Sequence, residues 1–185
     1  MKLLILASTG ILVVGVAAWF LTVFNRLVKR RNNVEASWGQ IDVQLVRRHD
    51  LIPNLVATVQ GYIAHERGTL QAVTAARAQA MAASGPAGRG DAEAGLTGAL
   101  QGLFGLAEAY PDLKASQNFL ALQHELANTE NRITYARQFY NDAVLGLNNQ
   151  VQSFPSMIVA GTTGFKVQEY FQAGLDARAP ANVRF

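Results

Sequence analysis

The residues whose types could do chemistry are three histidine–acid pairs, His49-Asp50, His65-Glu66 and His124-Glu125. An imidazole beside a carboxylate can serve as a general base or as part of a metal site. His49 and His65 are 16 residues apart, so on one straight helix their rings would lie about 24 Å from each other, too far to share a metal ion. His65 also lacks the second histidine of the zinc-protease pattern. We therefore expect no catalytic residue, no metal and no cofactor.

Other catalytic motifs are missing as well. The chain has no Gly-x-Ser-x-Gly elbow, no phosphate-binding loop and no cysteine. Four glycines, Gly95, Gly98, Gly102 and Gly105, follow no strand and have helical spacing, which is not the pattern of a nucleotide-binding loop. A thin helical protein also offers little cleft for paired carboxylates. We expect a protein that is not an enzyme; the alternative is a metal-dependent enzyme whose site is built between subunits around His49 or His65.

The first element of the chain gives the strongest structural signal. From Leu3 to Phe24 there are 22 residues without a charge. A helix of that length reaches about 33 Å, enough to cross the hydrocarbon layer of a membrane. A cleaved signal peptide is the alternative, but the apolar run continues past the small residues Val16 and Ala18, where cleavage would fall. We predict an uncleaved single-pass anchor over residues 1–25.

The basic residues gather directly behind this segment. They are Arg26, Lys29, Arg30 and Arg31, against Lys2 alone in front. Such a cluster attracts anionic lipid headgroups, and its position predicts a body on the cytoplasmic side of a bacterial inner membrane. Without these five cations the chain holds fewer Lys and Arg than Asp and Glu. We therefore expect the lipid bilayer, and no nucleic acid, as a partner.

Two long stripes of apolar residues with alternating three- and four-residue spacing follow. The first runs from Val34 to Ala80 and the second from Phe119 to Phe154. They predict an all-α fold, in which two long helices form an antiparallel hairpin with a left-handed supercoil. The first helix is expected over about residues 25–83, with a kink or break near Pro53. We assign residues 26–174 to this helical bundle.

A short glycine-rich helix is expected to connect the two long ones, over about residues 91–109, after the breaker at residues 84–90. Its glycines predict close approach of another helix, so that Gly98→Leu and Gly102→Leu would overpack the contact at a cost of about 1–3 kcal/mol each. An interfacial or re-entrant position of the uncharged residues 94–107 is the alternative. After residue 155 we expect an irregular stretch over residues 156–164, a short helix over residues 165–173 and an irregular tail over residues 175–185.

Polar residues on these elements are the candidates for interaction or packing. Arg48 interrupts the first stripe, and Arg132 and Arg137 belong to a polar face of the second helix, on which Tyr140 is a stripe residue. The two arginines could pair with Asp42, Asp50 or Glu130. Either this face is solvated and laced with ion pairs, or it fixes the register within the hairpin or between copies. Together with Gly98 and Gly102, these four residues form the candidate set.

Long segments of the chain resemble the LemA family. They include W-x-Q-I-D-V-Q-L-x-R-R-H-D-L-I-P-N-L-V at residues 38–56, A-E-A-Y-P-D-L-K-A at 107–115 and T-E-N-R-I-x-Y-A-R-x-x-Y-N-D at 129–142, with shorter matches at 24–28, 96–100, 118–120 and 154–165. Departures are Phe24, where the family usually has tyrosine, and Thr162-Thr163. The resemblance implies a bacterial single-pass membrane protein with a small external N-terminus and a helical body. It implies no activity, cofactor or catalytic residue, and its magnetosome relatives suggest membrane organisation.

Three functions remain in view from the sequence. The first is a membrane-anchored scaffold that self-associates as a homo-oligomer, and the second is a regulatory adaptor of another membrane protein, such as a protease or channel. The third is the metal-dependent enzyme described above.

Overall fold

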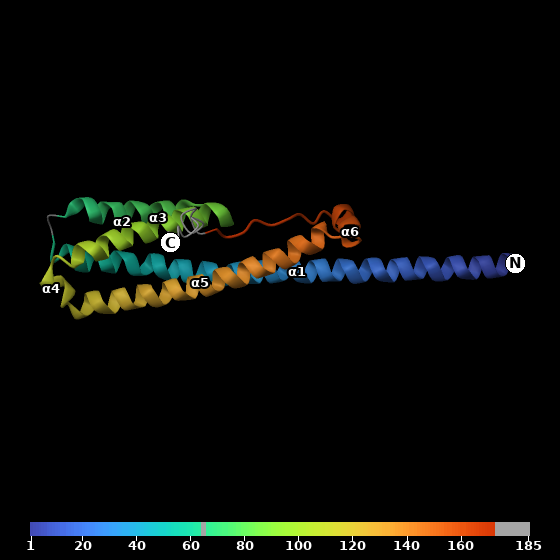
Figure 1. Cartoon of the computed structure of the whole chain (residues 1–185), viewed down its shortest axis with the longest axis horizontal. Coiled ribbons are helices and arrows are strands. Elements are labelled where there is room, and N and C mark those ends of the chain that lie inside the picture. Colours follow the sequence, from blue (N-terminus) through green and yellow to red (C-terminus); the bar gives the residue numbers. More distant parts are fainter. Residues whose placement is uncertain (64–65, 173–185) are drawn as a thin grey trace, which may run out of the picture. The chain divides into compact units, whose positions relative to one another are not determined.

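The structure is a computed structural model that describes residues 1–63 and 66–172, with only the backbone described for residues 3–5. Every regular element in this part of the chain is an α-helix, as predicted. It contains α1 (Lys2–Gln60), α2 (Arg67–Ala82), α3 (Pro86–Ala107), α4 (Pro111–Lys114), α5 (Gln117–Gln152) and α6 (Ser156–Thr163) (Figure 1). The predicted irregular tail at residues 175–185 lies outside the described residues.

The helices form two compact units, to both of which α1 and α5 contribute. Unit 1 comprises Met1–Trp38 and Phe139–Gln168, and unit 2 comprises Gly39–Gln138 together with the described residues 169–172. The domain boundaries predicted at residues 25 and 174 remain predictions.

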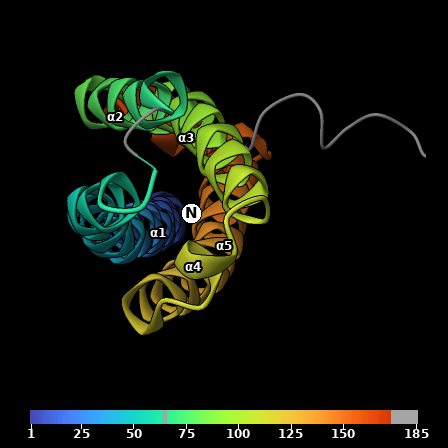
Figure 2. The same cartoon turned by 90° about the vertical axis from the view of Figure 1, so that its left-hand side faces the viewer.

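Unit 2 is a bundle in which α1, α2, α3 and α5 surround one core (Figure 2). Every helix of the unit supplies buried apolar side chains. The core consists of Ile52, Leu55, Val59, Ile63, Leu70, Val73, Ala80, Leu96, Leu100, Leu103, Ala107, Leu113, Phe119 and Leu126. Buried apolar area of this kind is the main source of stability in a small bundle.

The expectation of one continuous helix to about residue 83 was wrong. Helix α1 ends at Gln60, and the chain turns through Gly61 before α2 begins at Arg67. A glycine weakens a helix, and the main-chain N–H groups of Tyr62 and Ile63 both bond to the Val59 carbonyl in the turn. The reversal returns Ile63 and α2 to the core, where a straight rod would have left them exposed.

The connection between α2 and α3 is shorter than predicted. The breaker is limited to residues 83–85, and Gly85 takes a φ of 73°, which glycine adopts without a steric penalty. Helix α3 then starts at Pro86, five residues earlier than expected, because proline is favourable at the first helical position.

Unit 1 pairs the first part of α1 with the last part of α5. Trp38 packs on Tyr140 with ring centroids 5.3 Å apart, and a Cβ at Gly146 would lie 2.6 Å from the guanidinium of Arg30. Later residues of α5 therefore meet earlier residues of α1, so the two helices are antiparallel, as the stripes predict. Both stripes are largely buried inside the chain, with Ile41, Leu55 and Leu147 among their most enclosed side chains.

The segment after α5 also differs from the prediction. Residues 156–163 form α6, which buries Val159 and Ala160 and ends at Gly164 with a φ of 78°. Residues 165–172 are not helical. The side-chain amide of Asn148 donates to the carbonyl of Gln168 at 2.9 Å and accepts from its N–H at 2.8 Å, so the main chain at Gln168 is paired by a side chain and not by a helix.

Candidate functional site: a buried polar cluster and an exposed apolar helix

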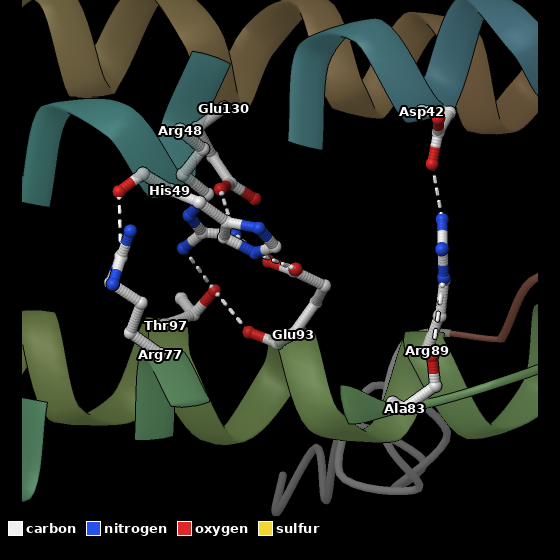
Figure 3. A network of polar contacts seen from close by, with 9 residues as sticks. All are labelled: Asp42, Arg48, His49, Arg77, Ala83, Arg89, Glu93, Thr97 and Glu130. Carbon is white, nitrogen blue, oxygen red and sulfur yellow. Dashed lines mark hydrogen bonds and ion pairs between the residues drawn. The ribbon is translucent and has the colours of Figure 1, made fainter. Parts of the chain in front are cut away.

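The largest set of buried polar side chains is in unit 2, where α1, α3 and α5 face one another. Arg48 of α1 is almost fully buried, with its Nη1 3.1 Å from Glu93 of α3 and 3.1 Å from Glu130 of α5. Its Nη2 donates to the hydroxyl of Thr97 at 2.7 Å. The three helices are thus joined through one guanidinium (Figure 3).

Glu93 is the acid at the centre of this cluster. One of its oxygens accepts from Arg48, and the other lies 2.6 Å from Nε2 of His49. Thr97 closes the arrangement by donating to the Glu93 carbonyl at 3.0 Å. Both carboxylate oxygens are therefore engaged, and a buried charge is tolerated because each one has partners.

The carbonyl of His49 has an unusual partner that explains why α1 continues through Pro53. A proline has no main-chain N–H, so the carbonyl four residues before it loses its helical donor. Nε of Arg77, on α2, donates to this carbonyl at 2.7 Å. An arginine from another helix thereby supplies the bond that the proline removes, and the predicted break at this point does not occur.

Two further ion pairs lie around the cluster. Arg89 of α3 pairs with Asp42 of α1 and also donates to the Ala83 carbonyl at 3.3 Å. Arg47 pairs with Glu125 at 2.6 Å, with both side chains nearly half exposed. Exposed pairs add little stability, so the buried cluster is the stronger constraint on how the helices pack.

The pairings expected for the polar face of α5 are not those found. Asp42 pairs with Arg89, and Glu130 pairs with Arg48. Arg132 is exposed and Arg137 half-buried. Tyr140 is buried in unit 1 against Trp38.

The glycines of α3 do not receive a neighbouring helix within the described chain. A Cβ at Gly98 or Gly102 would have nothing within 4 Å, so the close helix contact from which overpacking by leucine is expected is not found among the described residues. Gly90 is the glycine of α3 that is closely approached, because a Cβ there would overlap the carbonyl oxygen of Gln172. A contact between copies through Gly98 and Gly102 remains a prediction.

Sequence reasoning missed Glu93, Thr97, Arg77 and Arg89. The sequence does contain a signal for Glu93. Glu93 continues the three- and four-residue spacing of the buried Leu96, Leu100 and Leu103 on α3, and an acid on a buried stripe indicates a buried cation elsewhere. Arg48 on the first stripe was that cation.

The histidines do not gather into a metal site in the part of the chain that the structure describes. No group of three or more His, Cys, Asp or Glu side chains is found there. His49 is engaged by Glu93, and Nδ1 of the exposed His124 lies 3.2 Å from the Asn128 amide. His65 lies outside the described residues.

One titratable group of unit 2 is shifted. Burial raises the pKa of Tyr110 above its ordinary value of 10.0, and the hydrogen bond that its hydroxyl donates to Glu66 at 3.2 Å raises it further. This bond ties the start of α4 to the start of α2.

The second candidate feature is the N-terminal part of α1. Its apolar side chains are exposed on every side, among them Leu6, Ile11, Leu12, Val13, Val14, Val16 and Leu21. By length and composition α1 can cross a membrane. The first buried side chains of α1 are Val23 and Leu27, on either side of the partly buried Phe24. The side chain of Leu3 lies outside the described part of the structure.

The basic residues behind the apolar run are on the surface of unit 1. Arg26, Lys29 and Arg30 are exposed. Arg31 lies 3.7 Å from Glu35 and stacks over the ring of Phe165, 5.6 Å from its centroid. The uncharged run of α1 therefore gives way to basic residues at the place where other parts of unit 1 begin to cover the helix.

Comparison with known proteins finds similarity to magnetosome proteins and to one protein family. The chain is similar to the magnetosome proteins MamQ 1 and MamQ 2 of Paramagnetospirillum magneticum, each 27% identical over 186 residues that cover 86% of this chain and 68% of the relative. It is 25% identical to the magnetosome protein MamQ of Magnetospirillum gryphiswaldense, over 91% of this chain and 71% of the relative. The model of the LemA family matches residues 37–185, and the chain belongs to this family.

Proposed function

We propose that this protein is a membrane-anchored helical scaffold that self-associates and helps to organise the membrane, without catalytic activity. The observation that carries the proposal is the N-terminal part of α1, whose large apolar side chains have no cover from the chain itself. An exposed apolar surface of this size needs lipid or protein around it. The similarity to magnetosome proteins supports a role at a membrane.

Self-association draws its support from the outer surface of unit 2. The heptad stripes are used inside the chain, so they do not argue for assembly. Large apolar side chains nevertheless remain exposed, namely Val43, Val46, Tyr62, Met81, Leu120 and Tyr135. A scaffold would cover part of this surface with further copies.

Fractionation of cells that express the full chain tests the anchor. The protein is expected in the membrane pellet after an alkaline carbonate wash, because an apolar helix stays in the bilayer when peripheral proteins are released. A version with Leu12→Arg and Val16→Arg serves as the comparison and is expected to be extracted. Release of the wild-type protein by carbonate would overturn the proposal. Protease protection of a C-terminal tag in inverted vesicles would contradict the expected cytoplasmic body, since the tag should be cleaved there.

A second candidate function is a regulatory adaptor that docks another membrane protein. Its support is the exposure of Arg132, since two of its three candidate acidic partners, Asp42 and Glu130, pair with Arg89 and Arg48 instead. With Arg132→Ala and Arg137→Ala, a partner that co-purifies with the wild type should be lost while the helical content stays the same. Unchanged co-purification would count against this function.

A further inference from the structure

The apolar surface of unit 1 does not end with α1. Phe154, just before α6, is 79% exposed, and Met157 and Ile158 on the outer side of α6 are 50% and 53% exposed. Residues 143–165 contain no charged side chain. A water-facing surface normally carries charges, so this uncharged stretch with three outward-facing large apolar residues needs a different explanation.

The position of α6 supplies one. The ring of Phe165, one residue after the helix cap, packs edge-on against Phe24 with centroids 6.0 Å apart. Phe24 is the last apolar residue of the uncharged run of α1, and Val159 and Ala160 are buried on α6. Figure 1 shows α6 beside α1. The exposed face of α6 is therefore level with the end of the segment that is long and apolar enough to cross a membrane.

Cations border this surface on the side away from the apolar run. Arg31 lies over Phe165, and Lys166 follows it directly. Together with Thr163 and Gly164 they line a small pocket. Apolar side chains followed by Lys and Arg are the arrangement of segments that lie in the bilayer interface, with cations at the level of the phosphates.

We propose that α6 and Phe154 form a second membrane contact, which lies in the interfacial layer of the bilayer that α1 crosses, with Lys166 and Arg31 facing the lipid phosphates. This inference rests on the proposed membrane anchor. Lipid is the occupant because the surface is continuous with the lipid-exposed part of α1 through the Phe24–Phe165 contact. A second copy of the chain would have no reason to favour this level of α1.

Fluorescence from single cysteines tests the contact, and the chain is suited to it because it has no cysteine of its own. Ile158→Cys and, as a second site, Met157→Cys are labelled with a polarity-sensitive dye in the full chain. The protein is reconstituted in phosphatidylcholine vesicles with phosphatidylglycerol. Leu120→Cys, 47% exposed in unit 2, is the matched negative control, and Leu12→Cys is the positive control in the anchor.

The proposal expects blue-shifted emission at residues 157 and 158, with stronger quenching by phospholipids spin-labelled near the headgroup than by those labelled deep in the chain. The label at residue 120 should not be quenched by either phospholipid, even if a further copy covers it. Quenching at residue 12 without quenching at residues 157 and 158 would overturn this inference and leave the anchor intact. No quenching at residue 12 would overturn both. A blue shift at 158 that lipid labels do not quench, and that grows with the ratio of protein to lipid, would mean that a second copy covers α6.

Discussion

At the scale of single residues, the fold depends on one buried guanidinium. Arg48 is held by Glu93, Glu130 and Thr97 on two other helices. Removing water from these charges is expensive, and only complete pairing offsets the cost. The cluster therefore favours one alignment of α1, α3 and α5, because a helix that shifts by one residue leaves a buried charge without a partner.

Arg48→Ala should destabilise the protein by about 3–5 kcal/mol, because it leaves the Glu93 carboxylate buried with one partner fewer. Arg47→Ala, next to it in sequence, removes a half-exposed pair with Glu125 and should cost at most about 1 kcal/mol. Denaturant unfolding of the full chain in mild detergent, followed by circular dichroism, measures both. Equal losses of unfolding free energy in the two variants would show that the buried cluster stabilises the fold no more than an exposed ion pair.

Tyr110 gives the pH dependence of unit 2. Its pKa is raised in the folded state by burial and by its bond to Glu66, so the stability that it contributes is fully present below pH 10 and is lost as the pH rises through the folded-state pKa. Tyr110→Phe should abolish this part of the alkaline loss of stability. The comparison is the difference in melting temperature between wild type and variant across alkaline pH. A constant difference would contradict the shift.

The sequence predicts Arg48 as an unusual residue, but not its partners. Its position on an apolar stripe is a local signal. Glu93 and Glu130 are 45 and 82 residues further along the chain, and which of the acids reaches Arg48 depends on how the helices turn back. Asp42 and Glu130, which the sequence offers to Arg132 and Arg137 together with Asp50, pair with Arg89 and Arg48 instead, because the folded chain brings these two arginines closer to them.

At the scale of elements, the apolar periodicity predicts helices correctly but places their ends poorly. Tyr62, Glu66 and Thr69 keep the spacing of the first stripe, yet the helix stops at Gln60. Glycine at residue 61 and the burial of Ile63 decide the turn, and the gain from that burial exists only in the assembled core. Helix α6 shows no repeating apolar stripe in the sequence, because it has only 8 residues and buries only Val159 and Ala160.

Pro53 and Arg77 should be energetically coupled. Arg77→Met leaves the His49 carbonyl without its donor and should cost about 1–3 kcal/mol. In a Pro53→Ala background the new main-chain N–H can bond to this carbonyl, so the cost of Arg77→Met should fall. A double-mutant cycle measured by denaturant unfolding gives the coupling. Strictly additive losses would refute the assignment of Arg77 to this carbonyl.

Two glycines of α3 should respond in opposite directions to alanine. At Gly90 the new methyl group would overlap the Gln172 carbonyl, so Gly90→Ala should lower the melting temperature. At Gly98 the methyl group meets nothing within 4 Å, and the better helix propensity should add about 0.5–1 kcal/mol. Differential scanning calorimetry of the two variants checks the sign. Destabilisation by Gly98→Ala would reveal a neighbour that the single chain lacks.

At the scale of the whole molecule, large apolar surfaces remain that the chain does not cover itself. The sequence predicts the exposed apolar part of α1 from its length and lack of charge. It does not predict the exposed apolar residues of unit 2, because burial depends on which side of each helix faces the core. Assembly would account for these residues.

If the glycines of α3 contact another copy, Gly98→Leu and Gly102→Leu should change the assembly while the fold of the chain remains. The expected result is a shift to smaller masses in mass photometry with an unchanged circular dichroism spectrum, since a Cβ at either residue meets nothing within 4 Å in the chain, whereas a close helix contact leaves no room for a large side chain. The matched control is Gly39→Leu, which also has no neighbour within 4 Å. Identical masses for all three variants and the wild type would exclude the glycine face from assembly.

The most direct test of the scaffold is the assembly state of the full-length protein after gentle extraction from the membrane. Electron microscopy and mass photometry of the same sample give its shape and mass. The scaffold requires a discrete assembly of many copies that persists on dilution and in different mild detergents. Monomers throughout would contradict self-association, and the function would then have to be sought in a partner that co-purifies with the anchored chain.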